Sequence, residues 1–296
     1  MTTIVAVAVA AATGACEPDG RPYRPLTGDH PVVAAAGDIA CPGEPCDPQR
    51  GTAALVRRID PVVVLALGDN QYTNGTLGEF EASYDPTWGA FLARTRPVPG
   101  NHEYRTDGAA GYFEYFGARA SPGSDGDYGF DVGRWRLVAL NSAVDGAITA
   151  AQLEWVRSDL READRRCELA YWHHPRFSSG TVEGNDPTPD LEALWAVLVD
   201  EGVDIVLNGH AHQYERFAPL DADGRPSEEA GIREFVVGTG GGTPHAFEED
   251  PVAGSLVRRT DVHGVLELEL RPRDYAWRFV STDERVLDWG TGECHP

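Results

Sequence analysis

Five short aliphatic segments of this 296-residue chain each end in polar side chains that can bind metal ions. Residues 62–67 run into Gly68-Asp69-Asn70-Gln71-Tyr72, so a carboxylate and a phenol directly follow an apolar stretch. The other four segments end in Gly37-Asp38, Gly100-Asn101-His102-Glu103, His173-His174-Pro175 and Gly209-His210-Ala211-His212. Carboxylate, phenol, amide and imidazole groups are oxygen and nitrogen donors that suit first-row metals better than calcium.

These groups can act together only if the fold brings the five segments to one place. Parallel strands gather the residues at their carboxyl ends along one edge of a sheet, where open α/β folds place their sites. The glycines that precede four of the motifs allow a sharp turn and a close approach to a ligand. Two cations about 3.5–4 Å apart need a shared anionic ligand and several neutral ligands, so that positive charge remains for a phosphate. The candidate ligands are Asp38, Asp69, Tyr72, Asn101, His173, His210 and His212.

Each motif has a simpler interpretation when it is taken alone. A Gly-Asp pair after a strand is more often a turn, and a buried histidine is more often a hydrogen-bonded structural residue. The ordered set of five motifs is far more specific than any single one. The sequence lacks the Gly-x-Ser-x-Gly elbow of serine hydrolases, and it lacks the His-x-His-x-Asp-His cluster of β-lactamase-type zinc hydrolases.

The spacing of apolar residues predicts alternating strands and helices. Aliphatic runs typical of buried strands occupy residues 32–36, 62–67, 136–140, 169–172, 205–207 and 235–237. Helical patterns lie between several of them, at residues 52–59, 152–163 and 191–201. Continuous apolar strands indicate sheets that are covered on both faces, and therefore a layered α/β domain. Residues 265–270 and 275–281 alternate in polarity, as expected for an antiparallel hairpin.

The N-terminus predicts export, to an extracellular, periplasmic or lipid-anchored location at the cell surface. Residues 4–15 are too short to span a bilayer but suit the apolar part of a signal, which we assign to residues 1–16. The ending Thr-Gly-Ala-Cys resembles a lipoprotein cleavage site and would attach the protein to a membrane through a lipidated Cys16; the alternative is a signal with an incidental cysteine. Residues 17–31 are rich in Pro and Gly and predict a linker, followed by a single domain over residues 32–296.

The cysteines favour an oxidising compartment. Without Cys16, four remain, which suggests two disulfides in an exported protein. Cys41 and Cys46 would close a small loop, which leaves Cys167 to pair with Cys294, although four cysteines allow three pairings. The competing interpretation is a cysteine-rich metal site, but no pair has Cys-x-x-Cys spacing.

The net charge of −22 restricts the partners. A protein that grips nucleic acid normally presents a basic surface, so we expect no nucleic-acid binding. An anionic substrate would need a strong local positive centre such as a metal ion.

The ordered motifs resemble those of the calcineurin-like metallophosphoesterase superfamily, and Tyr72 points to its purple acid phosphatase-like branch. The match extends from about Val32 to Gly241, which is most of the chain. The resemblance implies a four-layer αββα sandwich with two mixed β-sheets and a dinuclear metal centre at the strand ends. In that family pattern one metal is held by Asp38, Asp69, Tyr72 and His212, and the other by Asp69, Asn101, His173 and His210.

The resemblance also implies an identity for the metals and a role for His102. A Tyr72 phenolate favours Fe(III) beside a divalent ion (Fe, Zn or Mn); if Tyr72 is only a structural phenol, both metals are divalent. His102 would be the catalytic residue that protonates the leaving alcohol or stabilises charge on phosphorus. His174 and Arg176 are candidates for substrate binding, and Arg176 has the alternative role of bracing its loop through a carboxylate.

The predicted function is an exported, metal-dependent phosphoesterase that hydrolyses small phosphate esters, preferentially monoesters, by attack of a metal-bound hydroxide. Two alternatives stay open. One is a phosphodiesterase or nucleotide hydrolase with the same centre. The other is a non-catalytic surface binding protein that retains the fold.

Overall fold

The computed structural model describes residues 20–26, 28–120, 126–143, 148–163, 165–181 and 190–296. The predicted export signal, with Cys16, lies outside these residues. Within them, no helix has both the length and the apolar character that crossing a bilayer requires.

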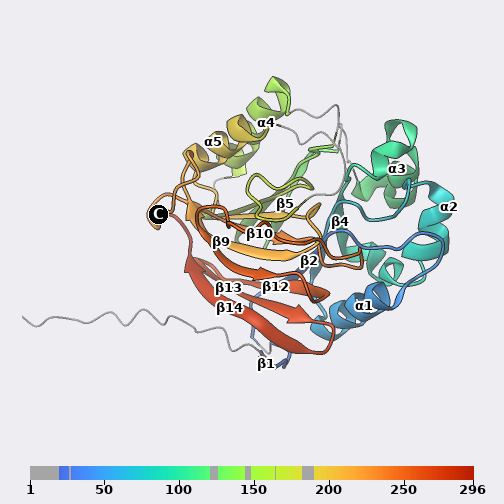
Figure 1. Ribbon diagram of the computed structural model, residues 1–296. Coiled ribbons are helices and arrows are strands. Elements are labelled where there is room, and N and C mark those ends of the chain that lie inside the picture. Colours follow the sequence, from blue (N-terminus) through green and yellow to red (C-terminus); the bar gives the residue numbers. More distant parts are fainter. Residues whose placement is uncertain (1–19, 27, 121–125, 144–147, 164, 182–189) are drawn as a thin grey trace, which may run out of the picture.

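The described residues form two seven-stranded sheets that lie face to face (Figure 1). In spatial order, the first sheet contains β1 (Arg21–Pro22), β14 (Arg285–Glu293), β13 (Asp274–Ser281), β12 (Gly264–Leu270), β2 (Val32–Ala36), β3 (Val63–Leu67) and β4 (Thr95–Val98). The second contains β11 (Ser255–Arg259), β9 (Tyr214–Leu220), β10 (Ile232–Val237), β8 (Ile205–Asn208), β7 (Cys167–Tyr171), β6 (Trp135–Ala139) and β5 (Tyr128–Val132). Both sheets are mixed: β2, β3 and β4 are parallel in the first sheet, as are β6, β7, β8 and β10 in the second.

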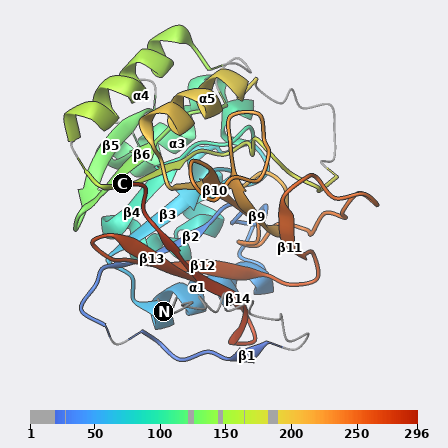
Figure 2. The same ribbon diagram turned by 90° about the vertical axis from the view of Figure 1, so that its left-hand side faces the viewer.

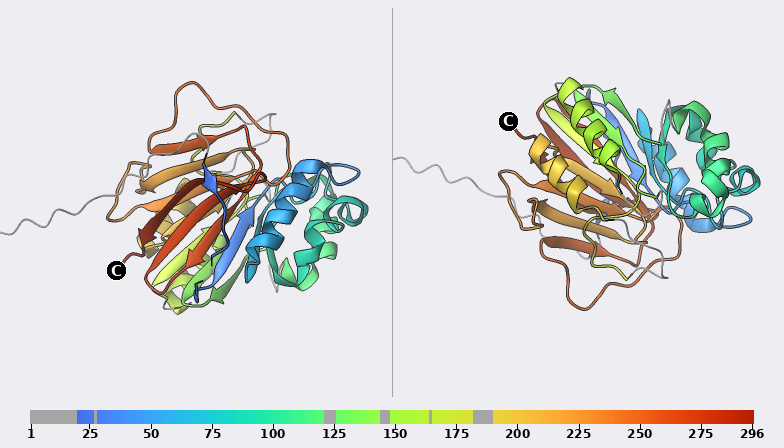
Figure 3. Two further views of the ribbon diagram at one scale, coloured as in Figure 1. Left: turned by 90° about the horizontal axis from the view of Figure 1, so that it is seen from below. Right: turned by 90° about the horizontal axis from the view of Figure 1, so that it is seen from above.

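Helices cover the outer faces of the two sheets (Figure 3). On the second sheet, α4 (Ala150–Ala163) and α5 (Glu192–Glu201) lie side by side, and on the first sheet α1 (Asp47–Ile59) packs against β12. The shorter α2 (Leu77–Glu79) and α3 (Ala110–Phe116) pack on each other on the side of α1. This order of layers confirms the predicted four-layer αββα sandwich.

Burial on both faces explains the continuous apolar runs. In β6, Leu137 and Ala139 belong to the core between the sheets, whereas Val138 belongs to the core beneath α4 and α5. In β8, Leu207 faces the first core and Val206 the second. Apolar side chains are therefore favoured at every position of these strands. All six predicted aliphatic strands, the three predicted helices and the C-terminal hairpin are confirmed, with ends that shift by a few residues.

Part of the segment that the sequence predicts as a linker packs on the domain. Figure 2 shows β1 beside β14, with which it pairs antiparallel. Tyr23 is only 3% exposed, and its hydroxyl donates a hydrogen bond to Glu267 Oε1 at 3.2 Å. The packed part of the chain thus begins ahead of residue 32.

The described residues contain two disulfides, which confirm the pairing favoured by the sequence. Cys41 pairs with Cys46, and Cys167 in β7 pairs with Cys294 just beyond β14. The second bond ties the C-terminal end to a central strand of the other sheet. Such cross-links stabilise mainly by limiting the conformations of the unfolded chain, more so for a long loop.

One buried carboxyl group far from the metal-ligand motifs predicts a pH-dependent stability. Burial, together with the charges of Asp204 and Glu201, raises the pKa of Glu168 to about 8, from 4.5 in the unfolded chain. The folded protein then holds a proton that the unfolded chain releases, so this group lowers the free energy of unfolding as the pH rises from about 4.5 to 8. We expect Glu168→Gln to raise the free energy of unfolding by about 1–2 kcal/mol at pH 8 and to leave it unchanged at pH 4.

Urea unfolding at both pH values measures this difference. Glu154→Gln, at an exposed position of α4, is the matched control and should change neither value. An equal gain at pH 4 and pH 8 would contradict the assignment, because it would not depend on ionisation.

Candidate metal centre

The five polar strand ends meet at one edge of the sandwich. The first sheet supplies Asp38, Asp69 and Asn101 from the loops after β2, β3 and β4, and the second supplies His173 and His210 from the loops after β7 and β8. The two sheets are joined here, because the backbone N–H of His210 donates a hydrogen bond to Asp38 Oδ2 at 2.8 Å.

One group of donors surrounds the hydroxyl of Tyr72. This oxygen lies 3.0 Å from Asp38 Oδ1, 3.2 Å from Asp69 Oδ2 and 2.8 Å from His212 Nε2. His212 Nε2 in turn lies 3.2 Å from Asp38 Oδ1. Four side chains from three loops therefore point their donor atoms at one another.

A second group surrounds the side-chain oxygen of Asn101. Asn101 Oδ1 lies 3.0 Å from His173 Nε2 and 3.1 Å from His210 Nδ1. His173 Nε2 is also 3.4 Å from Asp69 Oδ2, so Asp69 belongs to both groups. Ligand atoms of Asp38, Asp69 and His173 all lie within 4.8 Å of one another.

This arrangement fits a pair of metal ions. Lone-pair donors that converge at about 3 Å are stabilised when a cation lies among them, and a two-metal site needs one carboxylate common to both ions. Asp69 Oδ2 has that position, with one set of donors on each side. The seven predicted ligands are therefore brought together in two overlapping groups of four.

Left-handed backbone turns aim several of these side chains. Asp38, Asp69 and His210 have φ angles of 59°, 45° and 68°, a conformation that costs free energy for residues other than glycine. The loops also need close contact at Gly100, where an added Cβ would lie 2.2 Å from Asp69 Oδ1. Strain of this kind concentrates at functional sites.

The charges of the protein groups favour ionised carboxylates. Burial opposes ionisation of Asp69, but His173 and His102 outweigh it and hold the pKa of the carboxyl well below its ordinary value. Burial likewise opposes ionisation of Asp38, but the neighbouring His212 outweighs it, so the pKa of this carboxyl group is lowered. Burial and the neighbouring His173 lower the pKa of His210 to about 4, which keeps this imidazole neutral and able to donate a lone pair.

The side chain of Glu103 connects two of the loops that carry predicted ligands. Its Oε1 accepts a hydrogen bond from the N–H of Gln71 at 3.0 Å, and its Oε2 accepts one from the N–H of Gly100 at 2.7 Å. Because Gln71 precedes Tyr72 and Gly100 precedes Asn101, this fully buried carboxyl group fixes the spacing of the two donor groups. Burial and the charge of Asp69 raise its pKa to about 8.

His102 lies beside the donor groups without joining them. Its Nδ1 is 2.7 Å from the carbonyl oxygen of Thr73, its Nε2 is 3.8 Å from Asp69 Oδ2, and its ring centroid is 4.3 Å from that of Tyr72. Its backbone N–H donates to Asp69 Oδ1 at 2.8 Å. The contact with Thr73 fixes the ring at Nδ1, so Nε2 is available to a substrate bound at the centre.

A cavity of about 390 Å³ opens over the two groups. Its lining includes Asp69, Tyr72, Asn101, His102, His210 and His212. It also includes Arg105, Thr243 and His245, which are not among the predicted site residues. The ring of His245 stacks on His212, with centroids 3.9 Å apart and planes at 11°. In the sequence, the position of Arg105 two residues after the Gly-Asn-His-Glu motif is what indicates that this arginine lies near the site.

His174 and Arg176, the candidates for substrate binding, are not among the residues that line this cavity. His174 is 2% exposed, and its Nδ1 lies 2.9 Å from Ser142 Oγ. The backbone N–H of Arg176 donates to the buried Glu234 Oε1 at 2.9 Å, and the guanidinium lies over the ring of Phe177 at 5.1 Å. Both residues therefore contact the protein around the loop that carries His173.

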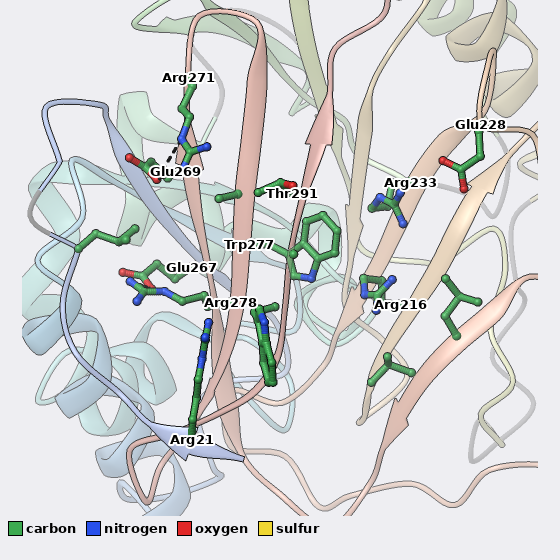
Figure 4. A pocket seen from close by; sticks show the side chains of 16 residues that line it. Arg21, Arg216, Glu228, Arg233, Glu267, Glu269, Arg271, Trp277, Arg278 and Thr291 are labelled. Atoms are coloured by element: carbon green, nitrogen blue, oxygen red, sulfur yellow. Dashed lines mark hydrogen bonds and ion pairs between the residues drawn. The ribbon is translucent and has the colours of Figure 1, made fainter. Parts of the chain in front are cut away.

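A larger cavity of about 920 Å³ is lined by five arginines and three glutamates (Figure 4). Arg216 makes a bidentate ion pair with the buried Asp288. Arg271 pairs with Glu269, as the dashed line in Figure 4 marks, and Arg278 pairs with Glu267. These ion pairs neutralise three of the five arginines, and none of the seven predicted ligands lines the cavity.

Comparison with known proteins agrees with this geometry. The family model of the calcineurin-like phosphoesterases matches residues 31–214. Purple acid phosphatase 15 of Arabidopsis thaliana is 30% identical over 218 residues, which cover 62% of this chain and 40% of that protein. Purple acid phosphatase 22 of the same plant is 27% identical over 245 residues, covering 73% and 54%. The chain thus spans about half the length of the curated relatives it matches.

Solved structures show the same fold. A purple acid phosphatase from yellow lupin (Lupinus luteus) seeds superposes with a TM-score of 0.72 and 20% identity, covering 93% of this chain and 55% of that one. A dimetal phosphatase from Danio rerio gives a TM-score of 0.60 with 14% identity, covering 89% and 98%. From the family match over residues 31–214, the chain belongs to the calcineurin-like phosphoesterase family, and the Arabidopsis thaliana relatives named above are purple acid phosphatases.

Proposed function

We propose that this chain is an exported phosphoesterase that holds two metal ions and hydrolyses small phosphomonoesters. The observation that carries the proposal is the position of Asp69 between two groups of donors that come from five loops. One ion is held by Asp38, Asp69, Tyr72 and His212, and the other by Asp69, Asn101, His173 and His210. When bound, such a metal pair polarises the phosphoryl oxygens and acidifies a coordinated water.

The charge of the ligands leaves the centre attractive to phosphate. Asp38, Asp69 and an ionised Tyr72 contribute three negative charges, and the other ligands are neutral. One trivalent and one divalent ion therefore keep a surplus of two positive charges. Burial and the carboxylates of Asp38 and Asp69 raise the pKa of Tyr72 well above its ordinary value, so the phenol ionises only beside a strongly charged cation such as Fe(III).

His102 has the role of proton donor in this proposal. The carbonyl oxygen of Thr73 accepts the proton of its Nδ1, which orients the ring. Nε2 then faces the cavity, where it can pass a proton to the leaving alcohol or hydrogen-bond to an oxygen on phosphorus. Arg105, in the cavity lining, contributes positive charge to the binding of the anionic ester.

The cellular location and the domain boundaries are inferred from residues outside the metal centre. We propose that residues 1–16 direct export and that the catalytic domain extends over residues 32–296, with residues 21–23 packed on it. The two disulfides support an oxidising compartment, in which such bonds persist. In the membrane-bound form of this proposal, a lipidated Cys16 attaches the exported protein to a membrane.

Metal analysis combined with a substrate panel tests the function. We expect two metal ions per chain and faster hydrolysis of alkyl and aryl phosphomonoesters than of bis-aryl phosphodiesters or nucleotides. A preference for diesters or nucleotides would replace the monoester assignment. A preparation that contains two metals but hydrolyses none of these substrates would favour a binding protein that retains the fold.

Tyr72→Phe tests the identity of the first metal. A phenolate bound to Fe(III) absorbs visible light, so we expect the metal-replete wild type to be coloured and the variant to lose the absorption band. The variant should also bind this metal more weakly, because one anionic ligand is gone. A colourless wild type with two metals per chain would refute the ferric assignment and leave two divalent ions.

A further inference from the structure

Two histidines of the metal centre hold their outer nitrogen in the same way. His173 turns Nε2 toward Asn101 Oδ1, and its Nδ1 lies 2.9 Å from the carbonyl oxygen of Leu67. His212 turns Nε2 toward the first donor group, and its Nδ1 lies 2.7 Å from the carbonyl oxygen of Thr243. Carbonyl oxygens only accept, so each Nδ1 carries the proton and each Nε2 keeps its lone pair for a metal.

His210 is oriented the other way round. Its Nδ1 lies 3.1 Å from Asn101 Oδ1, so Nδ1 is the inner nitrogen and Nε2 faces away from the centre. This Nε2 is buried and has no hydrogen-bond partner among the described residues. A metal-binding imidazole almost always donates the N–H of its outer nitrogen to an acceptor, and without one neither its tautomer nor its orientation is fixed.

His174 presents a matching nitrogen beside it. Its ring centroid lies 4.5 Å from that of His210, and a ligand nitrogen of each of these rings lies within 4.8 Å of the other. The Nε2 of His174 is also buried without a partner among the described residues. Two adjacent rings thus each carry one buried nitrogen that has no hydrogen-bond partner among the described residues.

Ser142 contacts the other ring nitrogen of His174. Its Oγ lies 2.9 Å from His174 Nδ1, and the same oxygen accepts a hydrogen bond from the backbone N–H of His174 at 3.2 Å. A hydroxyl oxygen has two lone pairs and can accept from both nitrogens, and in that arrangement the proton of the neutral ring is on Nδ1. The lone pair of His174 is then on Nε2, as a donor on His210 requires.

We propose that His174 is a positioning residue whose Nε2 accepts the Nε2–H of His210 and thereby holds His210 Nδ1 toward the second metal ion. Ser142, His174 and His210 form a chain of hydrogen bonds that ends at the metal. This inference rests on the proposed function, because it takes His210 as a metal ligand. It also gives a role to the side chain that follows the ligand His173 and does not reach the cavity.

Zinc binding by the full chain tests the role of the acceptor. His174→Phe keeps a ring without an acceptor, whereas the amide oxygen of His174→Gln can still accept. We expect the Phe variant to bind one of two zinc ions about 10–100-fold more weakly than the wild type, and the Gln variant to recover most of that loss. The metal-free Phe variant should unfold at close to the wild-type temperature. Equal losses in both variants, or no loss in either, would overturn the proposal.

The wild type separates this inference from the proposed function. A wild type that binds fewer than two zinc ions contradicts the dinuclear centre itself. A wild type and a Phe variant that both bind two ions with equal affinity contradict only the role of His174.

A second measurement needs no variant. Long-range ¹H–¹⁵N NMR of the zinc-loaded wild type reports which imidazole nitrogens carry protons. We expect the proton of His210 on Nε2 and the proton of His174 on Nδ1. A proton on Nε2 of His174 would overturn the proposal even if the Phe variant does not fold.

Discussion

Asp69→Asn should lower the turnover of a phosphomonoester by about 10³-fold and release at least one of the two metal ions. The reason is the position of the Asp69 carboxylate, whose Oδ2 lies 3.2 Å from the Tyr72 hydroxyl in one donor group and 3.4 Å from His173 Nε2 in the other. The amide has nearly the same shape but no negative charge to share between two cations. Metal content per chain and turnover under substrate saturation measure the effect.

Asp60→Asn is a matched control for this substitution. Asp60 also has a left-handed backbone, with φ of 52° against 45° for Asp69, so the exchange of carboxylate for amide has a similar local cost at both positions. Its side chain is 78% exposed and pairs with Arg94 on the surface. We expect the control to retain both metals and full turnover. If Asp69→Asn kept two tightly bound ions, the carboxylate would not be the shared ligand.

The sequence predicts the seven donor residues because each follows an apolar strand whose direction is set by the fold. Asp69, for example, comes two residues after β3, and a buried parallel strand leaves only its carboxyl end to carry polar groups. The same logic placed Asn101 after β4 and His210 after β8. The roles of these residues as ligands remain predictions, which metal analysis of their variants will test.

Loop residues that do not directly follow a buried strand could not be predicted in this way. Arg105 lies in a short helical turn and His245 in a loop after β10, and no periodic pattern fixes where such side chains point. His174 shows the opposite problem, because it neighbours a ligand in the sequence yet packs beneath the centre. The contacts that decide these positions, such as Ser142 with His174, join residues far apart in the chain.

Strand β14 escaped prediction for a different physical reason. Its second half contains Gly290 and Gly292, which weaken a strand pattern. In the structure the rings of Trp277 and Tyr275 cover these positions, where an added Cβ would lie 2.3 Å from the ring in each case. Packing of aromatic side chains from the neighbouring strand therefore makes glycine suitable within a strand, and that information lies in β13 rather than in β14.

His102→Ala should lower the turnover of an alkyl phosphate by about 10²–10⁴-fold while both metal ions stay bound. The ring stands beside the donor groups, with Nδ1 held by Thr73 and Nε2 3.8 Å from Asp69 Oδ2, so its loss removes no ligand. An alkoxide needs a proton as it leaves, whereas a nitrophenolate does not. The loss should therefore be less than about tenfold for an aryl ester with an acidic leaving phenol.

The comparison of leaving groups decides what His102 does. A large loss on the alkyl ester alone identifies a proton donor, and an equal loss on both esters identifies a residue that stabilises charge on phosphorus. Loss of metal from the variant would contradict both roles and make His102 a structural support, since its backbone N–H also donates to Asp69 Oδ1. His30→Ala, at an exposed position outside the cavity, controls for the removal of an imidazole and should match the wild type on both substrates.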